Sequence, residues 1–321
     1  MKSQSATLYK DIFKSERIVL YLLTFIMGGC GIAYEYTLSK ISSDLMGNSV
    51  AQWAIIIGLM MLCMGIGSDL QKYFSDKRLL EKFILFELLQ GLLGGFGPLI
   101  LFHTFGVYRD YFKLVQFLFL IVIGIIIGFE IPILSRINER YTKELKVNIG
   151  GILRMDYIGA FVGAVFWLFI LLPFFSLLQI GFVLGGLNIF VSGLTFFYFR
   201  RASRNKVFNA VLIFACLSAL VFGFIKAPRW SSFSEQKLYL DKVIYSKTTK
   251  YQHIVITRHR SGDIYCYING NLQFSSLDEH IYHEFLVHPA MKAAESRERV
   301  LILGGGDGLA LREVLKYTEV R

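Results

Sequence analysis

Seven apolar stretches, each long enough to cross a lipid bilayer, occupy most of the chain as far as residue 227. A transmembrane helix needs about 20 apolar residues in succession, and helices suit the hydrocarbon layer because their backbone polar groups bond to one another. The predicted spans are 18–38, 50–70, 83–103, 112–134, 156–175, 179–199 and 208–227. Glycines recur in several of them at positions suited to close helix contact in lipid. The pattern predicts a multi-span α-helical membrane bundle and argues against a soluble helical protein.

Basic residues in this region fall in alternate loops. The net charge of the chain is +10, and residues 1–227 hold 21 Lys and Arg against 13 Asp and Glu. The N-terminal tail and every second loop carry four basic residues each, whereas the intervening loops carry one, two and none. Cytoplasmic loops hold the excess of Lys and Arg. The pattern predicts a multi-pass protein of the cell (inner) membrane with a cytoplasmic N-terminus, and it does not indicate nucleic-acid binding.

The N-terminal residues and the cysteines do not indicate secretion or a reactive site. A cleavable signal peptide is not evident, because 17 mostly polar residues precede the first apolar stretch. The cysteines have no metal-binding or redox spacing, so we expect them to be packing residues; they are Cys30, Cys63, Cys216 and Cys266.

A different pattern begins after Pro228, where apolar and polar residues alternate. Strands are predicted at 238–246, 251–258 and 264–268, with turns at Ser261-Gly-Asp263 and Asn269-Gly270. A helix is predicted at 279–294, with Asp278 as its N-cap and a break near Pro289. We therefore expect a small antiparallel β unit of about sixty residues followed by a connecting helix.

A glycine-rich turn follows a short apolar segment near the C-terminus. Residues 300–303 predict a buried strand, Gly304-Gly-Gly-Asp-Gly308 a turn, and residues 309–317 a helix. Glycines let the backbone approach a nucleoside ligand closely, and the helix N-terminus presents free N–H groups. The order of these elements predicts the first βα unit of a Rossmann-like α/β domain.

At these residues the sequence resembles the polyamine aminopropyltransferase family, to which the spermidine synthases belong. The matching pieces are Tyr251-Gln252, Asn269-Gly-x-x-Gln-Phe-Ser-x-x-Asp-Glu-x-x-Tyr-His-Glu284, His288-Pro289, Gly304-Gly-Gly-Asp-Gly308 and Leu311-Arg-Glu-Val314. The apolar part resembles the multi-span region that is fused ahead of this domain in some bacterial members. Its matching pieces are Tyr34-Glu35, Gly47-Asn-Ser49, Gly128-Phe-Glu-Ile-Pro132 and Asp156-Tyr-Ile-Gly-Ala160.

The resemblance implies transfer of an aminopropyl group from the co-substrate decarboxylated S-adenosylmethionine to putrescine, with release of methylthioadenosine and without a metal or prosthetic group. Its fold would be of the class I methyltransferase type. The resemblance also assigns roles to residues: Gln252 contacts the nucleoside, Tyr282 and His283 line the amine channel, Gln273 lies along the same cleft, Asp307 holds the aminopropyl ammonium, and Gly304, Gly305, Gly306 and Gly308 form the nucleoside-binding turn. The implied division is a transmembrane domain at 1–227, a small β domain with its connecting helix at 228–298, and the start of the nucleoside-binding domain at 299–321.

Two family features are expected to fall after Arg321. They are the acidic residue that binds the ribose and the aspartate that deprotonates the attacking amine. We therefore expect that residues 1–321 form a C-terminally truncated member without aminopropyl transfer of its own, because a positioned base supplies about 10²–10⁴-fold in rate. The partners expected of the intact fold are the two substrates and the lipid bilayer, and the sequence leaves a homo-oligomer open.

Three alternatives compete with this interpretation. His280, His283 and His288, with Glu284, could be zinc ligands, although the family motif explains the same residues without a metal. Carboxylates within membrane spans are costly and often functional, which favours a transporter or polyamine-binding membrane protein with a non-catalytic soluble module. A plainer explanation pairs Glu130 and Asp156 with Arg136 or Arg154 near the membrane surface. The carboxylates in or at the edges of the predicted spans are Glu35, Glu87, Glu130 and Asp156.

Topology raises one conflict. Seven spans with a cytoplasmic N-terminus place the residues after 227 outside the cell, whereas the implied substrates are cytoplasmic metabolites. A re-entrant third or fifth stretch would resolve the conflict. We follow the loop charges, because they are present in this sequence whereas the activity is inferred.

Overall fold

A computed structural model describes residues 2–200, 205–249 and 252–321 and divides the chain into two compact units, Met1–Leu238 and Tyr239–Arg321. Arg201 and Arg204, which contribute to the loop charges, and Tyr251, which begins a predicted strand and one family motif, lie outside these residues.

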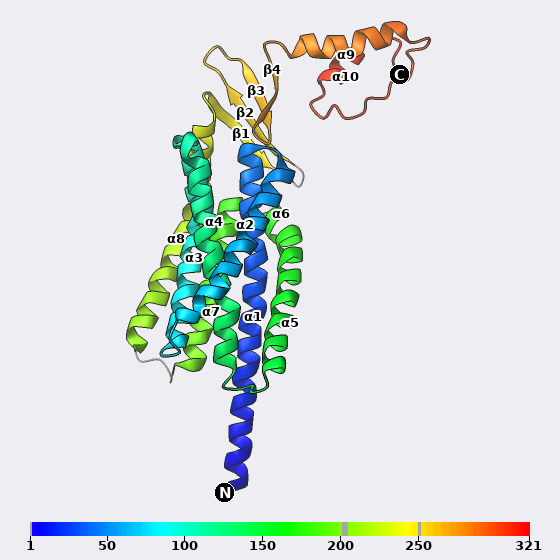
Figure 1. Ribbon diagram of the computed structural model, residues 1–321. Coiled ribbons are helices and arrows are strands. Elements are labelled where there is room, and N and C mark those ends of the chain that lie inside the picture. The colour runs from blue at the N-terminus through cyan, green and yellow to red at the C-terminus, as the bar shows by residue number, and fades with distance from the viewer. Residues whose placement is uncertain (1, 201–204, 250–251) are drawn as a thin grey trace. The chain divides into compact units, whose positions relative to one another are not determined.

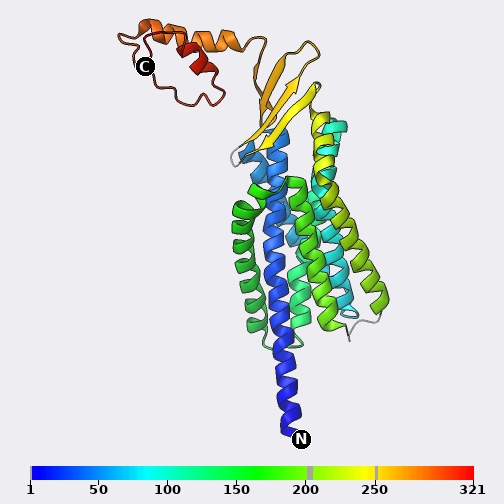
Figure 2. The same cartoon turned by 180° about the vertical axis from the view of Figure 1, so that it is seen from behind.

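The first unit is a helical bundle (Figures 1 and 2). Its long helices are α1 Lys2–Met46, α2 Ser49–Leu70, α3 Leu79–Val107, α4 Phe112–Asn138, α5 Leu145–Phe166, α7 Leu177–Phe199 and α8 Lys206–Leu238. Short turns join some of them: the 3₁₀ turns Gln71–Tyr73 and Arg109–Tyr111, a π-helical segment Trp167–Leu171, and α6 Leu172–Phe174. Among the described residues, seven helices are long and apolar enough to cross a membrane, which confirms the predicted number of apolar helices.

One predicted boundary in this unit was wrong. The fifth helix begins at Leu145, so Asp156 lies in the middle of α5 and not at its start. Lys146 was expected to lie in the loop before this helix, but polar residues continue a helix when they lie on an exposed face. The third and fifth helices, proposed as re-entrant, are both of full spanning length.

Arg136 has a different partner from the predicted one. Its guanidinium donates hydrogen bonds to the carboxylate of Asp76, to the side chain of Gln71 at 2.8 Å and to the carbonyl of Phe74 at 2.7 Å. Arg136 on α4 therefore binds the segment that connects α2 to α3. None of the described ion pairs joins Arg136 or Arg154 to Glu130 or Asp156, so the predicted pairing near the membrane surface was wrong.

Glycines allow three pairs of helices to approach closely. A Cβ added at Gly159 of α5 would lie 1.9 Å from the carbonyl oxygen of Phe25 on α1. One added at Gly128 of α4 would lie 2.2 Å from the carbonyl oxygen of Met64 on α2, and one at Gly185 of α7 would lie 2.4 Å from that of Gly91 on α3. Side chains at these positions would push the backbones apart, so small residues fix the spacing of α1–α5, α2–α4 and α3–α7.

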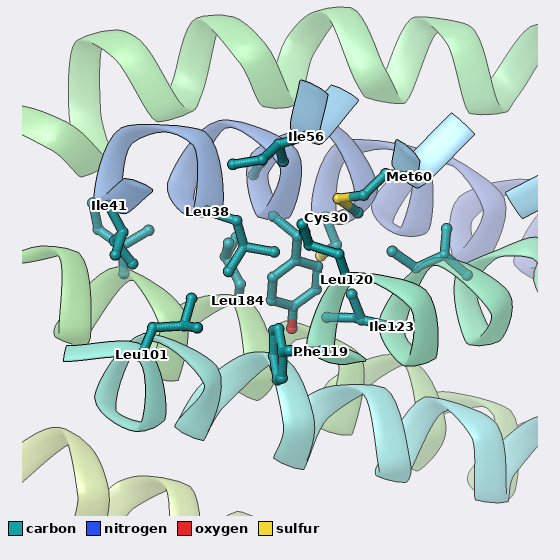
Figure 3. Packing of buried hydrophobic residues seen from close by; sticks show 14 of the residues in the cluster. Cys30, Leu38, Ile41, Ile56, Met60, Leu101, Phe119, Leu120, Ile123 and Leu184 are labelled. Atoms are coloured by element: carbon teal, nitrogen blue, oxygen red, sulfur yellow. The ribbon is translucent and has the colours of Figure 1, made fainter. Parts of the chain in front are cut away.

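Large apolar side chains fill the space between these pairs. Figure 3 shows part of this core, in which Leu38 of α1, Met60 of α2, Leu101 of α3, Ile123 of α4 and Leu184 of α7 belong to one buried cluster. The π-helical segment adds Trp167, whose indole Nε1 donates a hydrogen bond to Thr37 Oγ1 on α1 at 2.9 Å. The four cysteines are free and buried, as expected of packing residues.

The second unit begins with a four-stranded antiparallel sheet in the order β1-β2-β3-β4. Its strands are β1 Lys242–Thr248, β2 His253–Arg258, β3 Ile264–Ile268 and β4 Asn271–Ser275. The last strand was missed, although Asn269-Gly270 with positive φ at both residues is the turn that closes a β3–β4 hairpin. The first strand starts later than predicted, because α8 continues through Pro228 to Leu238.

Two helices follow the sheet, α9 Glu279–Ala293 and α10 Leu309–Val314. The predicted break in α9 was wrong: the helix continues through Pro289, and the residue one turn before it, Phe285, is 78% exposed, so water can bond the carbonyl that the proline leaves free. Asp278 holds the N-cap position, but its carboxylate accepts from Ser275 Oγ and not from the helix. The second helix ends three residues earlier than predicted.

The predicted strand at 300–303 is absent from the described structure. Leu301 and Leu303 are 83% and 89% exposed, and the sheet of the second unit consists of β1–β4. A single parallel strand cannot pair its backbone groups or bury both faces without neighbouring strands. Within this segment Ile302 packs against the apolar contacts of α9 and α10, while Leu301 and Leu303 remain exposed.

The glycine contacts predict a sharp difference between two substitutions on one helix. Gly159→Ala should destabilise the bundle by about 1–3 kcal/mol, because the methyl group overlaps the backbone of α1. Gly150→Ala, at a position in α5 with open space around it, should be neutral or stabilise by up to about 1 kcal/mol. Thermal unfolding of the purified protein in detergent measures both; equal midpoints for the two variants would contradict the predicted packing of α1 against α5.

Candidate functional site

The glycine turn has a backbone that only glycine adopts without strain. Gly304, Gly305 and Gly308 have φ values of 94°, 66° and 76°, and the N–H of Gly308 donates to the carbonyl of Gly305 at 3.0 Å. Asp307 Oδ1 accepts a hydrogen bond from the N–H of Leu309 at 2.8 Å, which joins the turn to the first residue of α10. Residues 304–307 are all exposed. The turn therefore presents an open backbone surface with one carboxylate beside it.

The neighbouring residues Tyr282 and His283 lie on different faces of α9. His283 is 5% exposed, and its Nδ1 lies 2.6 Å from the carbonyl oxygen of Glu279 and 2.9 Å from its carboxylate. Tyr282 is 66% exposed and lines a shallow groove with apolar neighbours, among them Phe285 and Leu286. The two rings are 5.1 Å apart in an edge-on arrangement. Only Tyr282 is therefore free to contact a ligand directly.

The two candidate glutamines belong to the sheet. Gln252 lies just before β2, where its carbonyl accepts from the N–H of Thr249 at 2.8 Å. Gln273 is exposed on β4, and its side-chain amide reaches the carbonyl of Asn271. None of the hydrogen bonds of the described residues joins either glutamine to α9 or to the glycine turn. The structure thus brings Tyr282 and His283 together, but it does not bring the glutamines into contact with them.

An ion-pair network between α9 and α10 was missed from the sequence. Arg312 of α10 donates to both carboxylate oxygens of Glu279, at 2.7 and 3.1 Å, and to Oε1 of Glu313 at 2.9 Å. Glu313 is 1% exposed and also pairs with Lys316. Glu279 binds both Arg312 and His283. In the sequence, only the family motif Leu311-Arg-Glu-Val314 drew attention to residues of this network.

These contacts change the acidity of the side chains involved. The hydrogen bond from Arg312 holds the pKa of Glu279 below its usual value. The hydrogen bond from Lys316, assisted by Arg312, does the same for the pKa of Glu313. Both carboxyls are therefore ionised around neutral pH and fix α10 against α9. Apolar contacts of Val287 and Met291 with Ala310 and Val314 complete the interface.

One group of side chains in the described residues has the spacing of metal ligands: Glu284, His288 and Glu313, whose donor atoms lie within 4.8 Å of one another. It contains neither His280 nor His283 of the zinc alternative. Lys316 contacts both of its carboxylates, and Arg312 contacts Glu313. Because cationic side chains already neutralise these carboxylates, the arrangement is a poor donor set for a metal ion.

Comparisons with known proteins found one matching domain family and several similar proteins. The Spermine/spermidine synthase domain matches residues 279–321, which include α9, the glycine turn and α10. The chain is 42% identical to a polyamine aminopropyltransferase of Leptospira interrogans and 36% identical to one of Oceanobacillus iheyensis, over 94% of the chain and 60% and 59% of those relatives. It is 38% identical to polyamine aminopropyltransferase 1 of Streptomyces coelicolor, over 96% of the chain and 59% of that relative. No solved structure matches the chain.

The chain thus places a bundle of long apolar helices ahead of the region that matches the Spermine/spermidine synthase domain. Over nearly its whole length the chain is similar to polyamine aminopropyltransferases, at 36% to 42% identity. It spans about 60% of the length of the curated relatives that it matches.

The network around Arg312 predicts a pH-sensitive contact. Arg312→Met should loosen α10 and speed amide exchange of its backbone roughly tenfold, because it leaves two buried carboxylates short of a partner. Since the pKa values of Glu279 and Glu313 are lowered in the folded chain, their contribution is complete above the usual value of 4.5 and is lost as the pH falls below it.

Hydrogen exchange with mass spectrometry measures the opening of α10 over this range of pH. The control is Arg299→Met, which removes the same charge from an exposed position. If both variants exchanged alike at neutral pH, the network would not hold α10 in place.

Proposed function

We propose that the protein is a membrane-bound, spermidine synthase-like aminopropyltransferase, which transfers the aminopropyl group of decarboxylated S-adenosylmethionine to putrescine. The observation that carries this proposal is the match of residues 279–321 to the Spermine/spermidine synthase domain, with Asp307 beside an exposed glycine turn. The relatives named above are polyamine aminopropyltransferases over a shared region that also includes the helical bundle.

The donor site would be the glycine turn. Gly304, Gly305, Gly306 and Gly308 would pass beneath the nucleoside, where a side chain would obstruct the ligand. Asp307 would pair with the ammonium of the aminopropyl group, because a carboxylate binds a cation strongly once the ligand excludes water. Gln252 would contact the nucleoside from the sheet. The nucleoside is a co-substrate in this proposal and not a prosthetic group.

The acceptor site would lie along α9. Tyr282 is exposed, so it could cover a bound amine, while His283 is buried against Glu279 and would act by holding its neighbour in position. Gln273 would approach the same cleft from β4. The attacking amine is protonated in water and must lose that proton before it can react, which requires a positioned base. In this proposal the residues of the second unit bind and orient the substrates.

We further propose that the helices of residues 1–227 lie in the cell membrane, that residues 228–298 form the small β domain, and that residues 299–321 begin the nucleoside-binding domain. The length and hydropathy of the seven helices support the membrane location. A second candidate function is a transporter or polyamine-binding membrane protein, and buried carboxyls in the bundle favour it. Binding of the donor to the second unit would distinguish the enzyme from this alternative.

Donor binding should depend on the charge of Asp307. Asp307→Asn should weaken decarboxylated S-adenosylmethionine roughly 10- to 100-fold, because a hydrogen bond to a charged group contributes about 1.5–3 kcal/mol. Methylthioadenosine lacks the ammonium, so its affinity should change little. Isothermal calorimetry on the purified protein measures both ligands.

Asp263→Asn is the matched control, since it removes a partly exposed carboxylate from a turn of the sheet. Unchanged affinity of Asp307→Asn for decarboxylated S-adenosylmethionine would overturn the role of Asp307. Loss of both ligands would instead show that the substitution disturbs the turn, whose asparagine should still accept from Leu309.

The orientation of the bundle in the membrane can be tested by cysteine labelling. Ser232, an exposed residue near the end of α8, should lie outside the cell if seven helices cross the membrane from a cytoplasmic N-terminus. In a background without cysteine, Ser232→Cys should react with a membrane-impermeant reagent in intact cells. Ser75→Cys, in the loop between α2 and α3, should react only after lysis. Labelling of Ser232→Cys only after lysis would place the second unit in the cytoplasm.

A further inference from the structure

Five polar side chains with almost no exposure lie in the middle of the helical bundle. They come from four helices: Tyr34 from α1, Glu87 and Gln90 from α3, Glu130 from α4, and Asn188 from α7. Their exposed fractions range from 0 to 4%. Two of the five are carboxyls, which are expensive to bury in an apolar interior unless something compensates them. The aminopropyl chemistry proposed above uses none of them.

Hydrogen bonds connect one side of this group. The hydroxyl of Tyr34 donates to Oδ1 of Asn188 at 3.0 Å, and Nδ2 of Asn188 donates to Oε2 of Glu87 at 3.0 Å. Tyr34 is fixed because its ring fills the space beside Gly94, where an added Cβ would lie 2.2 Å from the ring. The chain of donors therefore ends at one oxygen of Glu87 and holds that carboxyl in a single position.

The other side of the group lacks partners. Oε1 of Glu87, Oε1 of Glu130 and both amide atoms of Gln90 are buried without a hydrogen bond. The Gln90 amide is near enough to interact with the Glu130 carboxyl but does not reach hydrogen-bond geometry with it, and Glu130 is close enough to Glu87 for their charges to repel. A buried polar atom without a partner destabilises the folded state, so native proteins keep few of them. Four such atoms in one place indicate that a ligand completes the group.

The charges decide what kind of ligand fits. None of the described ion pairs involves Glu87 or Glu130, and the titratable neighbours that act on them are Cys30, Tyr34 and Asp156, which are all acidic or neutral. The free atoms are three carbonyl or carboxyl oxygens and one amide nitrogen. Oxygen atoms of this type bind protons and hard cations.

The space around the group restricts the size of the ligand. The backbones of α3 and α7 meet next to it, where a Cβ added at Gly91 would lie 2.9 Å from the carbonyl oxygen of Gly185. Gly94, one turn further along α3, is filled by the ring of Tyr34. Such close packing suits a small ion better than an extended organic amine.

We propose that Glu87, Glu130 and Gln90 form a buried site for one small monovalent cation, a proton or a sodium ion, in the core of the helical bundle. A proton would bond one carboxyl oxygen and donate to the other carboxylate or to the Gln90 carbonyl oxygen. A sodium ion would take the same oxygens as ligands. This site gives the bundle a function of its own, cation binding, which does not depend on the proposed aminopropyl transfer.

The test is cation-dependent stability of the full chain in lipid nanodiscs. The wild-type unfolding temperature should rise by several degrees when NaCl replaces choline chloride at equal ionic strength, if the ligand is sodium. If the ligand is a proton, this exchange should have no effect, and the temperature should rise as the pH is lowered from about 8 to about 6. Glu87→Gln and Glu130→Gln should each abolish the response, since they keep the shape and remove the charge.

Glu35→Gln is the matched control, because Glu35 is a buried carboxyl of α1 that is not among the unpartnered groups. It should keep the wild-type response to sodium. A wild-type protein that responds to neither sodium nor pH, or a response that persists in both Glu87→Gln and Glu130→Gln, would overturn the proposal.

A second measurement covers the case in which the glutamine variants do not fold. Infrared difference spectroscopy of the wild-type protein should show the carbonyl stretch of a protonated, buried carboxylic acid, which decreases on adding sodium or on raising the pH. Absence of any such change under both conditions would also contradict the site.

Discussion

Close backbone contact at glycine determines the arrangement of the helical bundle. In the membrane location proposed above, lipid would provide no hydrophobic force that drives one apolar helix against another, so association would depend on how closely the backbones can approach. Gly159, Gly128 and Gly185 allow α5, α4 and α7 to lie against α1, α2 and α3. The larger side chains of the core then fill the spaces that these contacts define. The buried polar group around Glu87 depends on the same contacts, because α3 and α7 meet beside it.

The sequence predicted the apolar helices well because bilayer thickness imposes a long, uniform signal on each of them. It predicted β3 to the residue, since alternation and an Asn-Gly turn are both local features. It failed at Asp156 and Pro289, where residues that usually mark a helix end lie inside helices. Pro289 lies on an exposed face of α9, whereas Asp156 is only partly exposed. A linear pattern does not show on which face of a helix such a residue will lie.

The candidate site was predictable in its residue types but not in its contacts. The glycine turn has positive φ at three of its glycines, as close backbone approach requires. The pairing of Glu279 with Arg312 joins residues 33 positions apart, and no periodicity relates them. The same is true of Tyr34 and Asn188, which are 154 positions apart. Such pairs depend on how helices are placed in space, whereas sequence motifs report the local backbone.

The π-helical segment Trp167–Leu171 lets one helix contact α1 in two different ways. Residues four apart in a regular α-helix shift by about 40° around its axis, so a row of such residues gradually leaves the face of its partner. The wider π turn offsets this shift. Gly159 and Gly163, which contact the backbone of α1, can thus share one face with Trp167 and Leu171, which are 3% and 2% exposed. One end of the helix contacts the backbone of α1 through glycines, and the other end contacts α1 through the large side chain of Trp167.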